Sequence, residues 1–443
     1  MDWLDNLKLR VSYGEVGNDG INSSLWSQNW EATSDKRYQG AVNGAFLPSY
    51  SLGADMANKD LKWETTITRN IGVDFGFFNS RLTGTIDAYW NTTKDLLMKT
   101  AIPGITGFTS TYANVGQTSN KGIEFALQGV LVKTRDWNVT AGFNINFNRG
   151  KVDKLADNVT GLYGTEWATS STFPKSDYVL KEGRPVGLVR GLTADGFYTT
   201  DDFTYENGVY TLKEGVADVS SAVFPNYHLH NGMNERPAGQ LAYPGMAKFK
   251  DLNDDGIIND DDVDVIGDMT PVHTGGFNIN ATYKNFDLGL YFNWSYGNEI
   301  YNVNKLAALY GYKEGAVYEN KLSIVKDCYK IYDVVNGELV ALTTPEQLNA
   351  ANANAKLPLA YSENGYVSTL GIEDGSYLRL NTLTLGYTLP KSMLQKAGIS
   401  NLRVYGSIYN VFTITGYSGI DAEVSTSTST KTYPQLGMDW GTY

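Results

Sequence analysis

Residues 138–148 read Asn-Val-Thr-Ala-Gly-Phe-Asn-Ile-Asn-Phe-Asn, and this short stretch decides the fold class. Its odd-numbered positions carry Val139, Ala141, Phe143, Ile145 and Phe147, whereas its even-numbered positions carry asparagine, threonine and glycine. Successive side chains of a β-strand point to opposite faces of the sheet. The stretch is therefore predicted to be a strand with one apolar face and one polar face.

Eight other segments show the same alternation at strand length. They cover about residues 7–14, 63–78, 81–91, 121–132, 275–284, 287–297, 377–389 and 402–414. Nearly all of them reach the roughly 9–11 residues that a tilted strand needs to cross a bilayer. The nine segments predict an all-β chain whose strands face hydrocarbon on one side and water on the other.

The connections between these strands alternate between short and long. Short turns are expected around 79–80, 133–137 and 284–286, with about ten residues at 390–400. Long polar loops are expected at 15–62, 92–120, 149–274, 298–376 and 415–443. Short turns at one end and long loops at the other are typical of an antiparallel transmembrane β-barrel, whose long loops are extracellular.

Nine strands leave the predicted barrel open. A barrel must close, because an unpaired strand edge in lipid leaves backbone groups without hydrogen-bond partners. We therefore expect about nine or ten strands of a larger barrel. The first ten residues do not resemble a signal peptide, so an export signal is expected outside this sequence.

Composition excludes several classes of protein. The net charge of -12 argues against nucleic-acid binding, which needs a basic surface. The single cysteine, Cys328, excludes an intrachain disulfide. No run of 18 apolar residues is present, so no helix is expected to cross a membrane. This does not argue against β-strands that cross a membrane, because only half of their residues need to be apolar.

Residues 251–262 match the pattern of a calcium-binding loop. Positions 1, 3 and 5 supply side-chain oxygens, position 7 its backbone carbonyl, and position 12 closes the coordination shell. The predicted ligands are Asp251, Asn253, Asp255, Ile257 and Asp262. The usual glutamate at position 12 is replaced by the shorter aspartate, and no clear helix flanks the loop. We expect Ca²⁺ to stiffen the loop, and the alternative is a solvated acidic turn.

Other candidate residues give weaker signals. His228 and His230 share one face of an extended segment, but two imidazoles without a third ligand are a poor metal site. Exposed aromatics can bind sugar rings or peptides. The loop aromatics are Trp26, Trp30, Tyr38, Tyr50, Tyr163, Trp167, Tyr198, Tyr301, Tyr310 and Tyr312. Charges on the polar faces, which are expected to line the lumen, are Lys8, Arg10, Arg81, Asp87 and Arg403. No catalytic constellation is found, so an enzyme is not expected.

Several stretches resemble one transporter family. They are 7–18 (LKLRVSYGEVGN), 61–89 (LKWETTITRNIGVDFGFFNSRLTGTIDAY), 114–124 (NVGQTSNKGIE), 376–390 (SYLRLNTLTLGYTLP), 403–416 (RVYGSIYNVFTITG) and 419–424 (GIDAEV). Together they resemble, in order, the C-terminal half of the SusC/RagA-like TonB-dependent outer-membrane transporters. Ala422 stands where that family usually has proline. Acidic loops similar to 251–262 recur at this place in the family.

The resemblance implies a function and a setting. It implies part of a 22-stranded barrel in the bacterial outer membrane, with all of 1–443 as the C-terminal part of the barrel. The signal sequence, plug domain and TonB-engaging segment would precede Met1. The whole protein would import an oligosaccharide or a peptide, with the TonB complex and a SusD-like surface lipoprotein as partners.

Two other classes remain open. A passive porin would have no plug and no lid. A soluble all-β adhesin or glycan-binding module would be extracted in buffer, whereas a barrel needs detergent.

Overall fold

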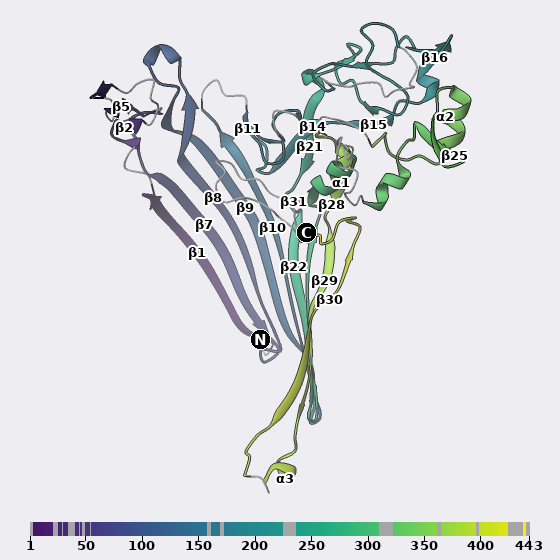
Figure 1. The fold of residues 1–443 in the computed structure, drawn as a ribbon. Helices are drawn as coiled ribbons and strands as arrows, with labels where there is room; N and C mark the ends of the chain where they lie inside the picture. Colours follow the sequence, from purple (N-terminus) through teal and green to yellow (C-terminus); the bar gives the residue numbers. More distant parts are fainter. Residues whose placement is uncertain are drawn as a thin grey trace.

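The computed structural model describes residues 3–20, 25–28, 30–33, 40–43, 45–46, 49–53, 55–156, 161–168, 172–224, 236–309, 322–360, 365–395, 398–423 and 437–439. Within these ranges the chain forms one large antiparallel wall and a compact cap that lies over one end of it (Figure 1). No helix of the described residues is long and apolar enough to cross a membrane.

Nine long strands form the wall, each antiparallel to the next. In spatial order they are β1 (Leu4–Asn18), β7 (Glu64–Phe77), β8 (Leu82–Ala101), β9 (Ser110–Lys133), β10 (Trp137–Lys154), β22 (His273–Tyr283), β23 (Phe286–Tyr296), β29 (Tyr377–Thr388) and β30 (Arg403–Thr415). A short tenth strand, β6 (Asp55–Met56), runs parallel to the start of β9. The nine predicted strands are confirmed, in the predicted order.

The wall is open at both edges. Among the described residues, β1 pairs only with β7, and β30 pairs only with β29. The strands fan out side by side in Figure 1 without returning to close on themselves. The prediction of a partial barrel is confirmed.

The register of the wall separates apolar from polar side chains. Val11, Ile71, Ala88, Ile123 and Phe147 are paired in one row across five strands. Most of these side chains are exposed, and Val11 is 71% exposed. The buried members of the three apolar clusters all lie outside the nine wall strands. The described residues thus leave the apolar face of the wall uncovered, as a lipid-facing surface requires.

Tight turns join the strands at the end away from the cap. Phe78, Asn79 and Ser80 all have positive φ and connect β7 to β8. Lys284, with φ 51°, does the same between β22 and β23. The connection from β29 to β30 is longer and contains the short helix α3 (Lys391–Leu394).

The prediction of a long loop at 92–120 is wrong. Strand β8 continues to Ala101 and β9 begins at Ser110, so that only 102–109 connect them, with a 3-10 turn at Gly104–Thr106. A bulge lies between Thr93 and Leu96, where Asp95 has φ 58°. A bulge changes which face successive side chains occupy, so the two-residue period breaks although the strand continues.

The loops expected at 149–274 and 298–376 fold into the cap. A four-stranded sheet orders β11 (Leu162–Gly164), β13 (Tyr178–Leu180), β14 (Leu188–Leu192) and β21 (Val263–Asp268). Two helices, α1 (Val303–Leu309) and α2 (Pro345–Ala351), belong to the second loop. The largest apolar cluster of the described residues lies here, and its aromatic members are Phe173, Tyr198, Phe203, Tyr210, Phe224, Tyr243, Phe249, Tyr329 and Tyr366.

The remaining strands among the described residues are short. In the first long loop they are β2 (Trp30–Thr33), β3 (Ala41–Val42), β4 (Ala45–Phe46) and β5 (Ser49–Leu52). In the cap they are β12 (Thr172–Phe173), β15 (Ala194–Phe197), β16 (Phe203–Glu206), β17 (Val209–Leu212), β18 (Asp218–Val219), β19 (Ala247–Phe249), β20 (Ile257–Ile258), β24 (Glu299–Asn302), β25 (Tyr332–Val335), β26 (Glu338–Ala341), β27 (Gly365–Tyr366) and β28 (Ile372–Asp374). The last, β31 (Met438–Asp439), pairs with β24.

Candidate transport site

Charged side chains meet on the polar face of the wall. Arg10 lies beside Gly72, which in turn lies beside Asp87, in a row that crosses β1, β7 and β8. The Arg10 guanidinium crosses over the glycine, with Nη2 at 2.7 Å from Asp87 Oδ2 and 2.8 Å from Asp74 Oδ1. A Cβ at Gly72 would lie 2.7 Å from Arg10 Nη2, so a side chain there would displace the arginine.

A similar ion pair over a glycine lies near the opposite edge of the sheet. Asp287 on β23 is paired with Gly386 on β29, and Arg403 on β30, two residues before Tyr405, the β30 partner of Gly386, reaches diagonally to Asp287. Arg403 Nε donates to Asp287 Oδ1 at 2.9 Å, again across the glycine. Ion pairs that face a water-filled interior hold neighbouring strands together and keep that face polar.

A third row uses a tyrosine. Tyr89, Gly122 and Asn148 are paired across β8, β9 and β10, and Tyr89 donates its hydroxyl to Asn148 Oδ1 at 2.8 Å. Of the five charges predicted to line the lumen, Arg10, Asp87 and Arg403 form ion pairs that lie over Gly72 or Gly386. Lys8 shares their face, whereas Arg81 lies in a turn and donates to the Val130 carbonyl at 3.3 Å.

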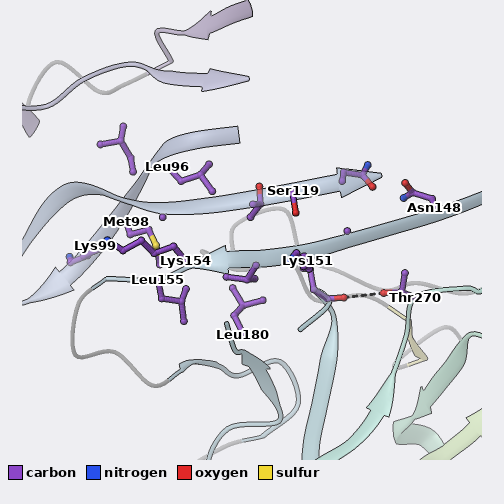
Figure 2. Close-up of a pocket in the computed structure, with 17 residues that line it drawn as sticks. Leu96, Met98, Lys99, Ser119, Asn148, Lys151, Lys154, Leu155, Leu180 and Thr270 are labelled. Atoms are coloured by element: carbon purple, nitrogen blue, oxygen red, sulfur yellow. Dashed lines mark hydrogen bonds between the residues drawn. The ribbon is translucent and has the colours of Figure 1, made fainter. Parts of the chain in front are cut away.

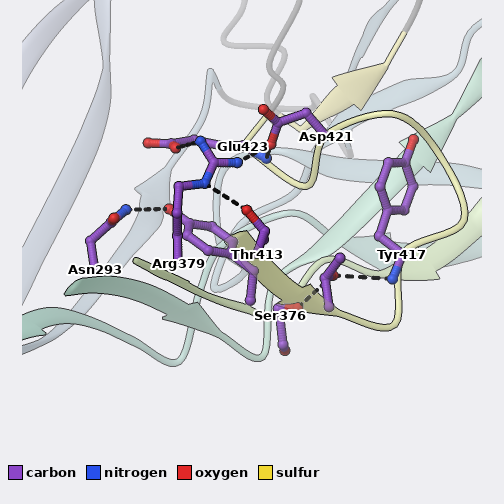
Figure 3. A network of polar contacts seen from close by, with 9 residues as sticks. Asn293, Ser376, Arg379, Thr413, Tyr417, Asp421 and Glu423 are labelled. Carbon is purple, nitrogen blue, oxygen red and sulfur yellow. Dashed lines mark hydrogen bonds and ion pairs between the residues drawn. The ribbon is translucent and has the colours of Figure 1, made fainter. Parts of the chain in front are cut away.

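The segment after β30 is fastened to the wall by a buried arginine (Figure 3). Arg379, on β29, is 7% exposed. Its Nη1 donates to Glu423 Oε2 at 2.8 Å and its Nε to Thr413 Oγ1 at 3.0 Å, and it also pairs with Asp421. Sequence reasoning missed this cluster, although Asp421 and Glu423 lie in the quoted stretch 419–424.

A second carboxylate fastens the same segment to the cap. Glu373, on β28, accepts hydrogen bonds from the Ser418 amide and hydroxyl, both at 2.9 Å, and from Lys305 Nζ at 3.0 Å. Burial alone would raise the pKa of Glu373. The bonds from Ser418 and Lys305 outweigh burial and hold its pKa below the ordinary value.

The predicted calcium loop has a well-defined turn. Asp251 Oδ2 accepts from the Gly256 amide at 2.7 Å, and Gly256 has φ 84°. Asp262 is fully buried, and its two oxygens accept from the amides of Leu252 and Asn259 at 2.7 and 2.8 Å. These contacts fold positions 1 and 12 into one loop.

Metal ligation at this loop stays a prediction. Among the described residues no group of three or more His, Cys, Asp and Glu side chains is placed to hold a metal ion. Two of the five predicted donors, the Asn253 amide and the Ile257 carbonyl, are of other types. His228 and His230 lie outside the described residues.

Two of the ten loop aromatics considered as candidates for ligand contact are buried in the cap. Tyr198 and Tyr301 are fully buried, and the Tyr198 hydroxyl donates to the Ala217 carbonyl at 2.7 Å. They are core residues of the cap because the long loops pack against each other. Trp167 is half-buried, with its ring edge-on to Tyr301. The exposed members are Trp26, Trp30, Tyr50 and Tyr163, and Tyr38, Tyr310 and Tyr312 lie outside the described residues.

Comparison with known families decides the identity of the wall. The family model described as TonB dependent receptor-like, beta-barrel, matches residues 2–253. The chain belongs to this family. The TonB-dependent receptor P3 of Formosa agariphila is 30% identical over 98% of the chain and 38% of the relative. The TonB-dependent receptor SusC of Bacteroides thetaiotaomicron is 28% identical over 98% of the chain and 36% of the relative.

Solved structures support the same fold. The RagAB peptide importer in its closed-closed state superposes with a TM-score of 0.67 over 95% of this chain and 39% of that chain, at 24% identity. The chain thus spans less than two-fifths of the relatives it matches. As a TonB-dependent receptor barrel, it is an outer-membrane protein, which confirms the predicted location and the SusC/RagA-like resemblance.

This TonB-dependent receptor barrel carries fixed charges on the polar face of its wall, and the cap lies over one end of the wall. The sequence alone predicted the luminal charges but neither their partners nor the cap, because these depend on which strands and loops become neighbours. Glycine on the polar face of a strand, as at Gly72, Gly122 and Gly386, was the available signal.

Proposed function

We propose that the whole protein imports a nutrient across the outer membrane in a TonB-dependent manner. The single observation that carries this proposal is a wall with an uncovered apolar outer face, a luminal face lined by ion-paired rows, and a folded cap over its extracellular end. The relatives support it, since SusC is named a TonB-dependent receptor and RagAB is described as a peptide importer. No catalytic role is proposed.

The competing function is passive diffusion through a porin. The two differ in their need for energy, because an importer driven through TonB stops when that coupling is removed. Uptake of labelled oligosaccharides and peptides should be measured in cells with and without a functional TonB complex. We expect uptake to fall to background without TonB. Uptake that continues at the same rate would support the porin.

The whole protein is further proposed to work with a SusD-like surface lipoprotein. The folded cap gives such a partner a rigid surface on the extracellular side, where a lipoprotein would sit as a lid. Purification of the tagged protein in mild detergent tests this. We expect one lipoprotein of the SusD type to co-purify in equal amount, and recovery of the barrel alone would argue against the partnership.

Calcium at residues 251–262 is proposed as a structural feature. The spacing of the five oxygen donors and the turn at Gly256 support it, and the ion would tie the start of the loop to Asp262. Terbium luminescence and resistance to proteolysis with and without Ca²⁺ give two readouts. We expect Asp255→Asn to abolish both effects and Asp260→Asn, outside the predicted ligands, to retain them. Equal behaviour of the two variants would contradict the site.

A further inference from the structure

One row of side chains on the outer face of the wall is basic. Toward the cap end of the strands, the apolar row that runs from Val11 to Phe147 is followed on the same face by Tyr13, Arg69, Trp90, Lys121 and Arg149. Consecutive rows on one face of a sheet lie two residues apart along each strand. This basic row therefore has the same orientation as the apolar row and faces the lipid side.

The basic row lies at the level where the hydrocarbon of a bilayer ends. Trp137, on the same face of β10, marks the turn end of the wall, and its ring lies 4.4 Å from that of Tyr283 between centroids. From Trp137 to Arg149 the strand extends about 40 Å, at about 3.4 Å per residue. At a tilt of about 40° this is a height of about 30 Å, the thickness of the hydrocarbon core. The basic row is thus at the level of the lipid headgroups on the cap side.

The three cations of the basic row have no carboxylate partner among the described residues. Lys121 is exposed. Arg149 Nη1 donates to the Pro271 carbonyl at 2.6 Å, and Arg69 Nη1 donates to Thr92 Oγ1 at 3.5 Å. These neutral acceptors direct the guanidinium groups without compensating their charge. The two arginines described above on the polar face differ, since both are paired with aspartates.

Nearby carboxylates leave this positive charge in excess. Beyond the basic row, Asp153 accepts from Ser119 Oγ at 2.9 Å and pairs with Lys151 at 3.0 Å. Figure 2 shows Ser119 and Lys151 on the neighbouring strands β9 and β10. Among the described residues of the basic row and the next row, from β1 to β10, Glu15 is then the one carboxylate left to balance three cations. The excess is local, because the whole chain has a net charge of -12.

We propose that the basic row binds the phosphate of a membrane lipid, while the acyl chains of this lipid lie on the apolar rows below. The N–H groups of arginine match the oxygens of a phosphate, and lysine attracts its charge. The exposed rings of Tyr13 and Trp90 are typical of strands at a membrane surface. One lipid can contact both kinds of row, whereas inorganic phosphate would contact the cations alone. This site lies on the outer face and does not depend on the proposed import function.

Retention of lipid on the immobilised whole protein in detergent tests this site. The probes are radiolabelled dioleoyl phosphatidic acid and dioleoyl phosphatidylcholine, which share their acyl chains. We expect the wild type to bind phosphatidic acid with a Kd at least tenfold lower than that of phosphatidylcholine. Arg69→Gln/Lys121→Gln/Arg149→Gln should raise the Kd of phosphatidic acid at least tenfold, because one cation contributes about fivefold to binding of an anionic lipid. Arg69→Lys/Arg149→Lys keeps the charge and should stay within about threefold of the wild type.

The matched control removes the same charge elsewhere. Lys175, Lys330 and Lys356 are exposed in the cap, and their triple replacement by glutamine should bind phosphatidic acid as the wild type does. Inorganic phosphate added at constant ionic strength should leave the lipid bound, because it lacks the contacts of the acyl chains. Equal Kd values for the two lipids, equal losses in the two triple glutamine variants, or displacement of the lipid by inorganic phosphate would each overturn the proposal.

Discussion

At the scale of single residues, glycine sets the luminal surface of the wall. Over each of Gly72, Gly122 and Gly386, two polar side chains from neighbouring strands meet. The absence of a side chain lets an arginine or tyrosine lie flat over the strand, as cross-strand pairing over a glycine permits. The alternation of the strands was predictable from the sequence, but these partners were not, because they depend on register.

Gly122→Ala tests this role of glycine. A Cβ at this position would lie 2.4 Å from the Tyr89 hydroxyl and 2.6 Å from the Phe147 carbonyl, so backbone must move. We expect a loss of about 2 kcal/mol in the free energy of unfolding, typical of overpacking, measured by denaturant titration in detergent. Gly406→Ala, with open space around it, is the control and should change little. Equal stability of the two variants would contradict the close packing over Gly122.

Arg379 offers a second test at this scale. Arg379→Met removes the buried partner of Asp421 and Glu423, both of which are partly exposed. We expect the free energy of opening of residues 416–423 to fall by about 2 kcal/mol, measured by hydrogen exchange. Arg379→Lys keeps the charge but loses the planar guanidinium, so its free energy of opening should lie between those of the wild type and of Arg379→Met. Unchanged exchange in this segment would show that the cluster does not hold it.

At the scale of elements, the strand positions were predictable and some of their ends were not. The turn ends agree closely, since Phe78, Asn79, Ser80 and Lys284 form tight connections where the alternation stops. The extracellular ends of β8 and β9 were missed because the bulge at Asp95 interrupts the period. A strand segment outside the membrane also needs no apolar face toward lipid, so its apolar and polar residues alternate less regularly and the strand is harder to predict from the sequence.

The connection from β28 to the segment after β30 should depend on pH. The pKa of Glu373 lies below its ordinary value of about 4.5 in the folded state. Its contribution to stability is therefore fully present above about pH 4.5 and is lost as the pH falls through the lowered folded value. We expect the protection factor of the Ser418 amide to decrease in that acidic window. In Glu373→Gln the protection factor of the Ser418 amide should be lower and should not vary with pH in this window. If the variant kept the wild-type pH profile, Glu373 would not be the group responsible for the pH dependence.

At the scale of the whole molecule, the cap was the largest surprise. The loops were predicted to be long and polar, yet they build an apolar cluster from residues far apart in sequence, such as Tyr210 and Tyr329. No local pattern reveals such contacts, because the loop aromatics follow no period. The wall, by contrast, repeats the same alternation of apolar and polar residues in each of its nine strands. For this reason its strands could be predicted from the sequence.

Cys328 reports on the integrity of the cap. It is the single cysteine of the chain and is buried, and burial together with the nearby Asp327 raises the pKa of its thiol to about 11. Because the thiolate is the reactive form, maleimide labelling at pH 8 should be roughly a hundredfold slower in the folded protein than in denaturant. Fast labelling of the folded protein would show that this part of the cap is open.

The central claim is that the wall presents apolar side chains to lipid and polar side chains to a water-filled interior. The most direct measurement places a nitroxide at each position from 141 to 147 in turn, with Cys328→Ser as background, in the whole protein reconstituted in bilayers. Accessibility to oxygen, which partitions into lipid, is compared with accessibility to a water-soluble nickel complex. We predict oxygen maxima at 141, 143, 145 and 147 and nickel maxima at 142, 144 and 146. Uniform protection from both reagents, as in a dry protein core, would contradict the account.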